Sequence, residues 1–167
     1  MQILNEMLLD YDTLISGDDS VVSRLKIEEL VSIALKAVYK YDKYLIDIMA
    51  NERCIVFRFG YYFQTLLSMH RKYNEYDLDL EYNRDGEDSK KTPNHEKGIY
   101  PDVILHKRGN NNDNLLVMEF KGHWNNKGQE IDKNKIHDLM NHDGKYKYKN
   151  GYIVFLDKND FSADSIL

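Results

Sequence analysis

The chain has 167 residues, of which 42% are hydrophobic and 31% are charged, so we expect one soluble globular domain with a substantial core. Its formal net charge of −5 argues against a large non-specific nucleic-acid surface, although active-site carboxylates that bind metal would contribute to that total. The single cysteine, Cys54, excludes an intramolecular disulfide framework and fits a reducing cytosol.

The sequence also bears on location. Residues 1–6 lack the basic start of a signal peptide. No apolar run is long enough to span a bilayer. We therefore expect a cytoplasmic protein that makes no membrane contact.

Residues 1–50 are expected to form an N-terminal helical extension. Residues 3–15 predict a short helix, which ends in a polar segment. Asp19 or Ser20 could cap a second helix that runs to about residue 49. Its inner positions hold apolar residues at helical spacing: Leu25, Leu30, Ile33, Ala34, Val38 and Leu45.

A third helix, expected over residues 52–71, is the first element of the predicted core. Asn51 is its expected N-cap. Glu52 lies just before the apolar stripe, so it heads the face that turns toward the sheet. The alternative is that Glu52 only complements the helix dipole. The stripe consists of Ile55 or Val56, Phe59, Phe63, Leu66 and Leu67.

Strands are expected in the middle of the chain. Residues 78–82 alternate and predict an outer strand, whereas the charged segment 83–98 predicts a loop. Residues 100–106 and the apolar run 115–118 predict two strands joined by the turn-rich segment 109–114. Because the second of these strands is apolar at every position, we expect it in the centre of the sheet.

The last elements are a helix at residues 128–140, a break at 141–144 and a buried strand at 151–156. The tail that follows carries no assigned element. We expect a core over residues 51–157 and a C-terminal tail over residues 158–167, within a single compact domain overall.

The most informative residues lie at the ends of two predicted strands. One apolar run ends in Glu119, a spacer and Lys121, and Asp102 follows Pro101 at the start of the preceding strand. Since side chains alternate along a strand, Glu119 and Lys121 share one face. A hairpin pairs antiparallel, so Asp102 and Glu119 are expected to come together. Such a cluster is costly in a core and is what metal-dependent phosphodiester hydrolysis needs.

This pattern resembles the motif of the PD-(D/E)XK nuclease superfamily, here Pro101-Asp102 followed by Glu119-Phe120-Lys121. The resemblance covers roughly residues 51–157. Within this region the sequence is similar to a group of small standalone bacterial members. It implies an α/β fold with a restriction-endonuclease-like core, an α-β-β-β-α-β mixed central sheet flanked by helices. The other matching segments are Glu52-Arg53, Glu81-Tyr82-Asn83-Arg84, residues 101–109 and Tyr146-Lys147-Tyr148.

The resemblance implies a nuclease that uses Mg²⁺ or Mn²⁺ and acts on nucleic acid, with DNA favoured over RNA. In the superfamily the Asp and Glu bind magnesium and the Lys assists the attacking water or stabilises the developing charge; these roles fall on Asp102, Glu119 and Lys121. The backbone carbonyl of Phe120 could add a ligand. Glu52 could hold a second ion or position the metal, since related enzymes often take a carboxylate from this helix.

Other residues have weaker claims to the site. Arg84, Lys145, Lys147 and Tyr148 are candidates for nucleic-acid contact, because charge interleaved with aromatic rings suits phosphate contact and base stacking. A solvated edge before the last strand explains the three residues from 145 to 148 equally well. Glu81 could belong to the site or face solvent.

Two further patterns receive ordinary interpretations. Asp132 and Lys135 form an i,i+3 pair, which we interpret as surface support. The histidines show no ligand spacing, and one cysteine cannot build a thiolate site, so zinc is not expected.

Two alternatives of a different class stay open. The chain could be a nucleic-acid-binding protein that keeps the fold without turnover. It could also be a protein-interaction module, with its N-terminal helices as the surface of a homodimer.

Overall fold

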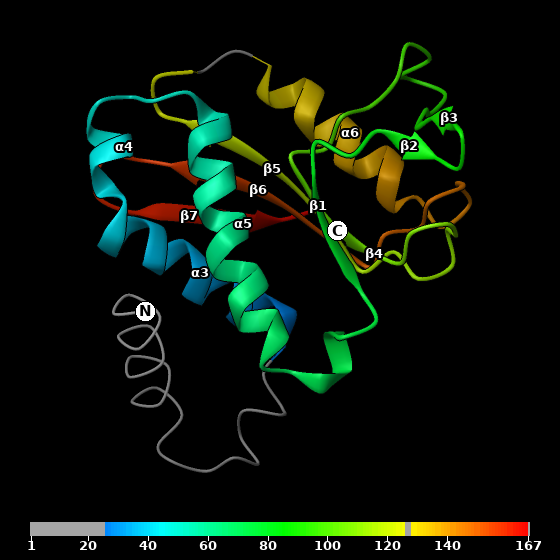
Figure 1. The fold of residues 1–167 in the computed structure, drawn as a ribbon. Helices are drawn as coiled ribbons and strands as arrows, with labels where there is room; N and C mark the ends of the chain where they lie inside the picture. The colour runs from blue at the N-terminus through cyan, green and yellow to red at the C-terminus, as the bar shows by residue number, and fades with distance from the viewer. Residues whose placement is uncertain (1–25, 126–127, 167) are drawn as a thin grey trace.

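The computed structural model describes residues 26–125 and 128–166 (Figure 1). The helix expected at residues 3–15 lies outside this part of the chain, as do the expected caps Asp19 and Ser20. Within it, no helix is long and apolar enough to cross a membrane.

A mixed sheet of five strands, in the order β1-β4-β5-β6-β7, forms the centre of the molecule. Strand β4 pairs antiparallel with both β1 and β5, β5 pairs parallel with β6, and β6 pairs antiparallel with β7. The expected α/β class is therefore confirmed. The strands are β1 (Asp77–Leu80), β4 (Val103–His106), β5 (Leu116–Gly122), β6 (Asn150–Leu156) and β7 (Phe161–Ser165).

The predicted hairpin between β4 and β5 is confirmed, and β5 lies in the centre of the sheet between β4 and β6. Two features depart from expectation. The expected loop over residues 83–98 contains a short hairpin, β2 (Arg84–Asp85) and β3 (Asp88–Ser89). The unassigned tail contains β7, a mostly exposed strand at the edge of the sheet.

Two helices replace the single helix expected to run to about residue 49. Helix α3 (Ile27–Tyr41) is followed by the short helix α4 (Lys43–Asp47). The break falls at Asp42, whose carboxylate accepts hydrogen bonds from Arg58 Nε at 2.8 Å and from the Tyr62 hydroxyl. These partners lie on the next helix, so a tertiary contact fixes the residue at which α3 ends.

Helix α5 (Glu52–Ser68) begins where the sequence predicted, with the Asn51 side chain accepting a hydrogen bond from the backbone N–H of Arg53 at 3.0 Å. It ends somewhat earlier than expected, and the 3-10 turn η1 (Arg71–Tyr73) follows. Helix α6 (Gln129–Met140) occupies the predicted position.

Helices cover both faces of the sheet (Figure 1). On one face, α3 and α5 pack on inward residues that alternate along the strands. On the other face, α6 packs through Ile136 and Leu139 on a second cluster that includes Ile104, Val117 and Ile153. Because Val117 belongs to the second face, Glu119 and Lys121 point toward α6 as well.

Candidate active site

Asp102 and Glu119 lie opposite each other on the face of the sheet that α6 covers. Val103 is paired with Met118, so the antiparallel register places Asp102, which directly precedes β4, across from Glu119 in β5. Asp102 Oδ2 accepts a hydrogen bond from the backbone N–H of Phe120 at 2.7 Å. The two carboxylates therefore lie side by side, as the sequence predicted.

Glu119 has one oxygen paired and one without a partner. Its side chain is almost fully buried, at 3% exposure for the residue. Oε2 lies 3.2 Å from Lys135 Nζ on α6. Oε1 is buried and has no hydrogen-bond partner among the described residues. A buried carboxylate oxygen of this kind is costly unless a donor or a cation satisfies it.

Burial and neighbouring charges raise the pKa of both carboxyl groups. Burial raises the pKa of Asp102 to about 6, and although the Phe120 N–H and Lys135 oppose this shift, the charges of Asp132 and Glu52 add to it. Burial and the neighbouring charge of Asp102 raise the pKa of Glu119 well above its usual value. A bound cation would relieve both effects, because it favours the ionised form of each group.

Lys121 stands beside this pair and is held from α6. Its Nζ lies 2.9 Å from Asp132 Oδ2, and its side chain is 14% exposed. Burial lowers the pKa of Lys121, but the hydrogen bond and charge of Asp132, helped by Glu52 and Asp102, outweigh burial and raise it. Lys121 is therefore a stable cation at neutral pH.

Asp132 and Lys135 belong to the site, and their interpretation as surface support was wrong. The i,i+3 pair exists, with Lys135 Nζ 2.9 Å from Asp132 Oδ1. However, Asp132 is only 4% exposed, and the two residues bond to Lys121 and Glu119 respectively. The sequence did hold a signal: Asp132 precedes Ile136 and Leu139 at helical spacing, so it heads a buried face as Glu52 does.

Glu52 ties the N-terminus of α5 to the end of β5. Its Oε1 accepts a hydrogen bond from the backbone N–H of Gly122 at 2.7 Å, and its Oε2 accepts one from Asn125 Nδ2 at 3.1 Å. Its charge also acts on Asp102 and Lys121. Glu52 thus points toward the sheet, as expected. Its hydrogen bonds go to the backbone of Gly122 and the side chain of Asn125, which both follow Lys121 in the chain.

The candidates for nucleic-acid contact lie elsewhere. The backbone N–H groups of Lys149 and Asn150 donate to the carbonyls of Asn114 and Leu115, so the segment over residues 145–149 lies where β5 begins, at the opposite end from Lys121. Lys145 pairs with Asp85.

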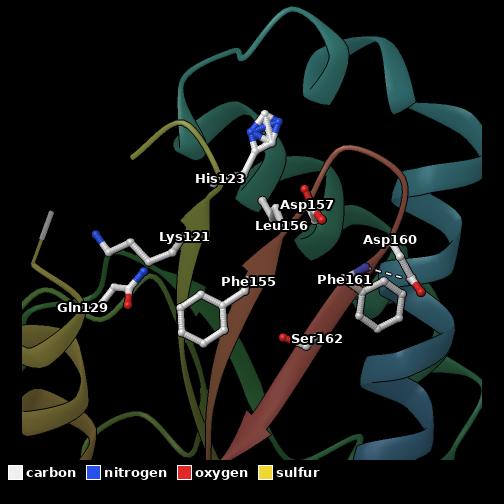
Figure 2. A pocket seen from close by; sticks show the side chains of 10 residues that line it. Lys121, His123, Gln129, Phe155, Leu156, Asp157, Asp160, Phe161 and Ser162 are labelled. Atoms are coloured by element: carbon white, nitrogen blue, oxygen red, sulfur yellow. Dashed lines mark hydrogen bonds between the residues drawn. The ribbon is translucent and has the colours of Figure 1, made fainter. Parts of the chain in front are cut away.

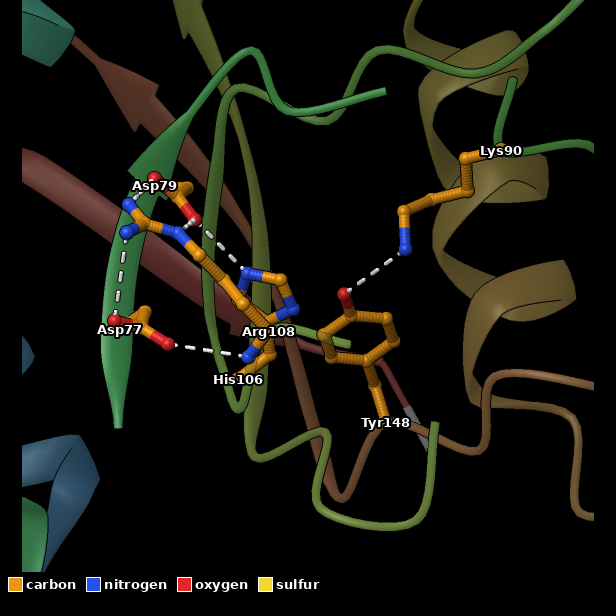
Figure 3. A network of polar contacts seen from close by, with 6 residues as sticks. All are labelled: Asp77, Asp79, Lys90, His106, Arg108 and Tyr148. Carbon is orange, nitrogen blue, oxygen red and sulfur yellow. Dashed lines mark hydrogen bonds and ion pairs between the residues drawn. The ribbon is translucent and has the colours of Figure 1, made fainter. Parts of the chain in front are cut away.

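Tyr148 is 1% exposed, so its ring is not available to stack on a base. It packs beside Lys90, with its hydroxyl 3.5 Å from the Lys90 ammonium (Figure 3). Lys147 is exposed and has a left-handed backbone conformation, with φ 52°.

The side chains of Arg84 and Glu81 do not join the carboxylates of Asp102 and Glu119 either. Arg84 is exposed in β2 and donates a hydrogen bond to the Glu87 carbonyl at 3.3 Å. The Glu81 side chain pairs with Arg53, and only its backbone N–H meets Asp102, donating to the carbonyl at 3.2 Å. Neither side chain is brought to Lys121.

The part of the chain that the structure describes contains no group of three or more His, Cys, Asp or Glu side chains placed to hold a metal ion together. The groups that meet at the predicted position are the carboxylates of Asp102 and Glu119. The backbone of Phe120 lies between Glu119 and Lys121.

A pocket of about 530 Å³ opens next to Lys121 (Figure 2). It lies at the ends of β5, β6 and β7, where Phe155 is the sheet neighbour of both Lys121 and Ser162. Its lining consists of Lys121, Gly122, His123, Gln129, Phe155, Leu156, Asp157, Asp160, Phe161 and Ser162. The charged cluster thus lies next to a hollow that Phe155 lines on the same face of the sheet.

No protein-family model, curated protein or solved structure matches this chain. The geometry described above is therefore what bears on its function.

Proposed function

We propose that this chain is a metal-dependent nuclease that hydrolyses phosphodiester bonds in nucleic acid, with DNA favoured. The observation that carries the proposal is the meeting of Asp102 and Glu119 on one face of the sheet beside Lys121. Apart from the turn η1 and the short hairpin β2-β3, the order α5-β1-β4-β5-α6-β6 also follows the α-β-β-β-α-β order of a restriction-endonuclease-like core, which we propose as the finer fold.

The donor set suits a hard divalent cation. Carboxylate and carbonyl oxygens are the ligands that Mg²⁺ and Mn²⁺ prefer. Glu119 Oε1 is a buried oxygen that lacks a partner among the described residues, and such an atom favours a cation beside it. Asp102, Glu119 and the backbone carbonyl of Phe120 would hold the ion, and Glu52 would position it or hold a second one. When bound, the ion polarises the phosphate and acidifies a water.

The proposed hydrolysis exchanges two protons with solvent and uses one side chain, Lys121. A water oxygen forms a bond to phosphorus, the bond to the leaving sugar oxygen breaks, and its electron pair stays on that oxygen, which takes up a proton from solvent. The attacking water loses its proton to solvent. Lys121 Nζ lies 2.9 Å from Asp132 Oδ2, and we assign its ammonium group to stabilising the charge on the phosphate oxygens.

Calorimetry tests the ion site. We expect Mn²⁺ to bind the wild-type protein and to bind Asp102→Asn roughly tenfold or more weakly, since even the loss of a residue that only supports a ligand costs that much. Asp143→Asn changes an exposed carboxylate on the loop after α6 and is the matched control, which should bind as the wild type does.

Circular dichroism should show both variants folded. Equal Mn²⁺ affinity in the wild type and Asp102→Asn would contradict the assignment. Mn²⁺ binding without cleavage of any nucleic acid would favour the non-catalytic alternative.

A further inference from the structure

The pocket beside Lys121 continues the site along the sheet. Lys121 is paired with Phe155, and Phe155 is paired with Ser162, so the three side chains form a row across β5, β6 and β7 on one face. Neighbouring strands are about 4.8 Å apart, so this row extends roughly 10 Å from Lys121. A group attached to a phosphate at Lys121 therefore has the pocket directly next to it.

The lining of this pocket is apolar in its wall and polar at its rim. Phe155, which is half-buried, supplies the apolar part on the face that carries Lys121, whereas Leu156 and Phe161 pack with the core on the other face; Figure 2 labels all three. A volume of about 530 Å³ lies within the usual range for small-molecule sites. A nucleobase with its sugar has the matching properties, namely a flat apolar face, polar edges and a comparable size.

The two ends of the rim have opposite charge. Lys121 lies at one end, whereas Asp157 and Asp160 lie on the turn between β6 and β7. The Tyr39 hydroxyl oxygen lies 2.7 and 2.6 Å from the backbone carbonyl oxygens of Asp157 and Asp160, and its single hydrogen can bond either of them, which ties this turn to α3. Carboxylates repel phosphate but accept hydrogen bonds from base amino groups. The rim therefore favours a phosphate at Lys121 and a base edge at the turn.

We propose that this pocket receives the unpaired nucleoside next to the scissile phosphate, so that the protein acts on single-stranded nucleic acid or frayed ends in preference to intact duplex. The inference rests on the proposed nuclease function and names the substrate class of that site. A paired base has both faces stacked and its edge occupied, so it cannot lie on Phe155 with its edge at the turn. A base in a single strand is free to stack on an aromatic side chain.

The test compares one labelled DNA strand in two states. The strand is offered alone and as a duplex closed by a hairpin loop at each end. Initial rates of cleavage at the positions that are paired in the duplex are measured in both substrates, with Mg²⁺ and with Mn²⁺. We expect the single strand to be cut about tenfold faster or more. Phe155→Leu keeps an apolar side chain of similar size but removes the ring, so it should raise the KM for the single strand several-fold, because stacking contributes to binding.

Phe57→Ala is the matched control. Phe57 is an aromatic residue of α5 that is 61% exposed and does not line this pocket, so the variant should behave as the wild type does. A second readout avoids catalysis: the only tryptophan, Trp124, follows the lining residue His123, and its fluorescence in EDTA should report single-stranded oligonucleotide binding that weakens in Phe155→Leu.

The outcomes separate the two proposals. Equal cleavage of the single strand and the closed duplex, or an unchanged KM and unchanged binding in Phe155→Leu, would overturn the pocket inference and leave the nuclease proposal standing. Absence of cleavage of either substrate with both metals would overturn the nuclease proposal itself.

Discussion

Lys90 is the least exposed charged residue of the described part of the chain, at 1% exposure. Its ammonium lies 4.4 Å from the ring centroid of Tyr146 and 3.5 Å from the Tyr148 hydroxyl (Figure 3). Burial lowers the pKa of Lys90 to about 8, with Asp85 opposing the shift and Lys145 adding to it. The tyrosine rings attract the cation but do not replace the water that it loses on folding.

This pKa makes the stability of the protein depend on pH above neutrality. Between the folded pKa of about 8 and the ordinary lysine value, the unfolded chain binds more protons at this position than the folded chain, so the contribution of Lys90 to stability rises with pH. Below pH 8 the penalty for the buried charge is present in full. Lys90→Met removes the charge and retains an apolar side chain.

We predict that Lys90→Met is more stable than the wild type at pH 7, by about 1–3 kcal/mol. The difference in free energy of unfolding should shrink as pH rises toward 10. Urea denaturation at several pH values measures it. A difference that stayed constant over this range would show that Lys90 does not titrate with the lowered pKa.

Strand alternation and hairpin pairing were enough to bring Asp102, Glu119 and Lys121 together from the sequence, because both are local rules. Asp132 and Lys135 were assigned to the surface because the i,i+3 rule says only that two side chains are neighbours on a helix. Which face of α6 meets the sheet depends on Ile136 and Leu139, whose partners lie on β4, β5 and β6. The burial of Tyr148 likewise depends on contacts with other elements, because it belongs to the same cluster as Ile136 and Leu139.

At the scale of elements, the contact between α6 and β6 sets where Asp132 and Lys135 lie. Gly151 in β6 permits this close approach: a Cβ at this position would lie 2.5 Å from Ile136 Cγ2 and would also collide with Met140. Ile136 is β-branched and fully buried, so it has little freedom to move away.

We predict that Gly151→Ala destabilises the protein by about 1–3 kcal/mol, because it overpacks this contact. Gly60→Ala is the matched control, since the new Cβ would meet only the flexible tip of Leu80 at 3.2 Å and Ala favours the interior of α5. Urea denaturation of both variants measures the difference. Equal stabilities of Gly151→Ala and the wild type would show that α6 moves away from β6 without loss.

The break between α3 and α4 and the strand β7 were not predicted, and each has a physical reason. The break between α3 and α4 depends on Arg58 and Tyr62, which bind Asp42 from 16 and 20 residues away along the chain. Strand β7 is mostly exposed, so its sequence lacks the apolar alternation by which strands are recognised. Local patterns could predict β4, β5 and α5, whereas the helix break depends on contacts distant in the sequence and β7 lacks a buried face that the sequence would record.

At the scale of the whole molecule, the charged groups gather where the parallel strands β5 and β6 end. Open sheets commonly bind ligands at the carboxyl ends of parallel strands. Glu52 reaches this edge from one layer, and Asp132 and Lys135 reach it from the other. Carboxylates outnumber ammonium groups at this edge, so the proposed nucleic-acid substrate requires the bound cation to offset their charge.

The most direct test of the nuclease proposal is the Mg²⁺-dependent cleavage rate of a single-stranded oligonucleotide, measured for the wild type and Lys121→Ala purified in parallel. Lys36→Ala, which removes an exposed lysine of α3, is the control for the change of charge. We predict cleavage by the wild type and Lys36→Ala that EDTA abolishes, and a rate about 100-fold lower or more for Lys121→Ala with its fold intact, as for the loss of a charge-stabilising donor. Equal rates for the wild type and Lys121→Ala would contradict the account.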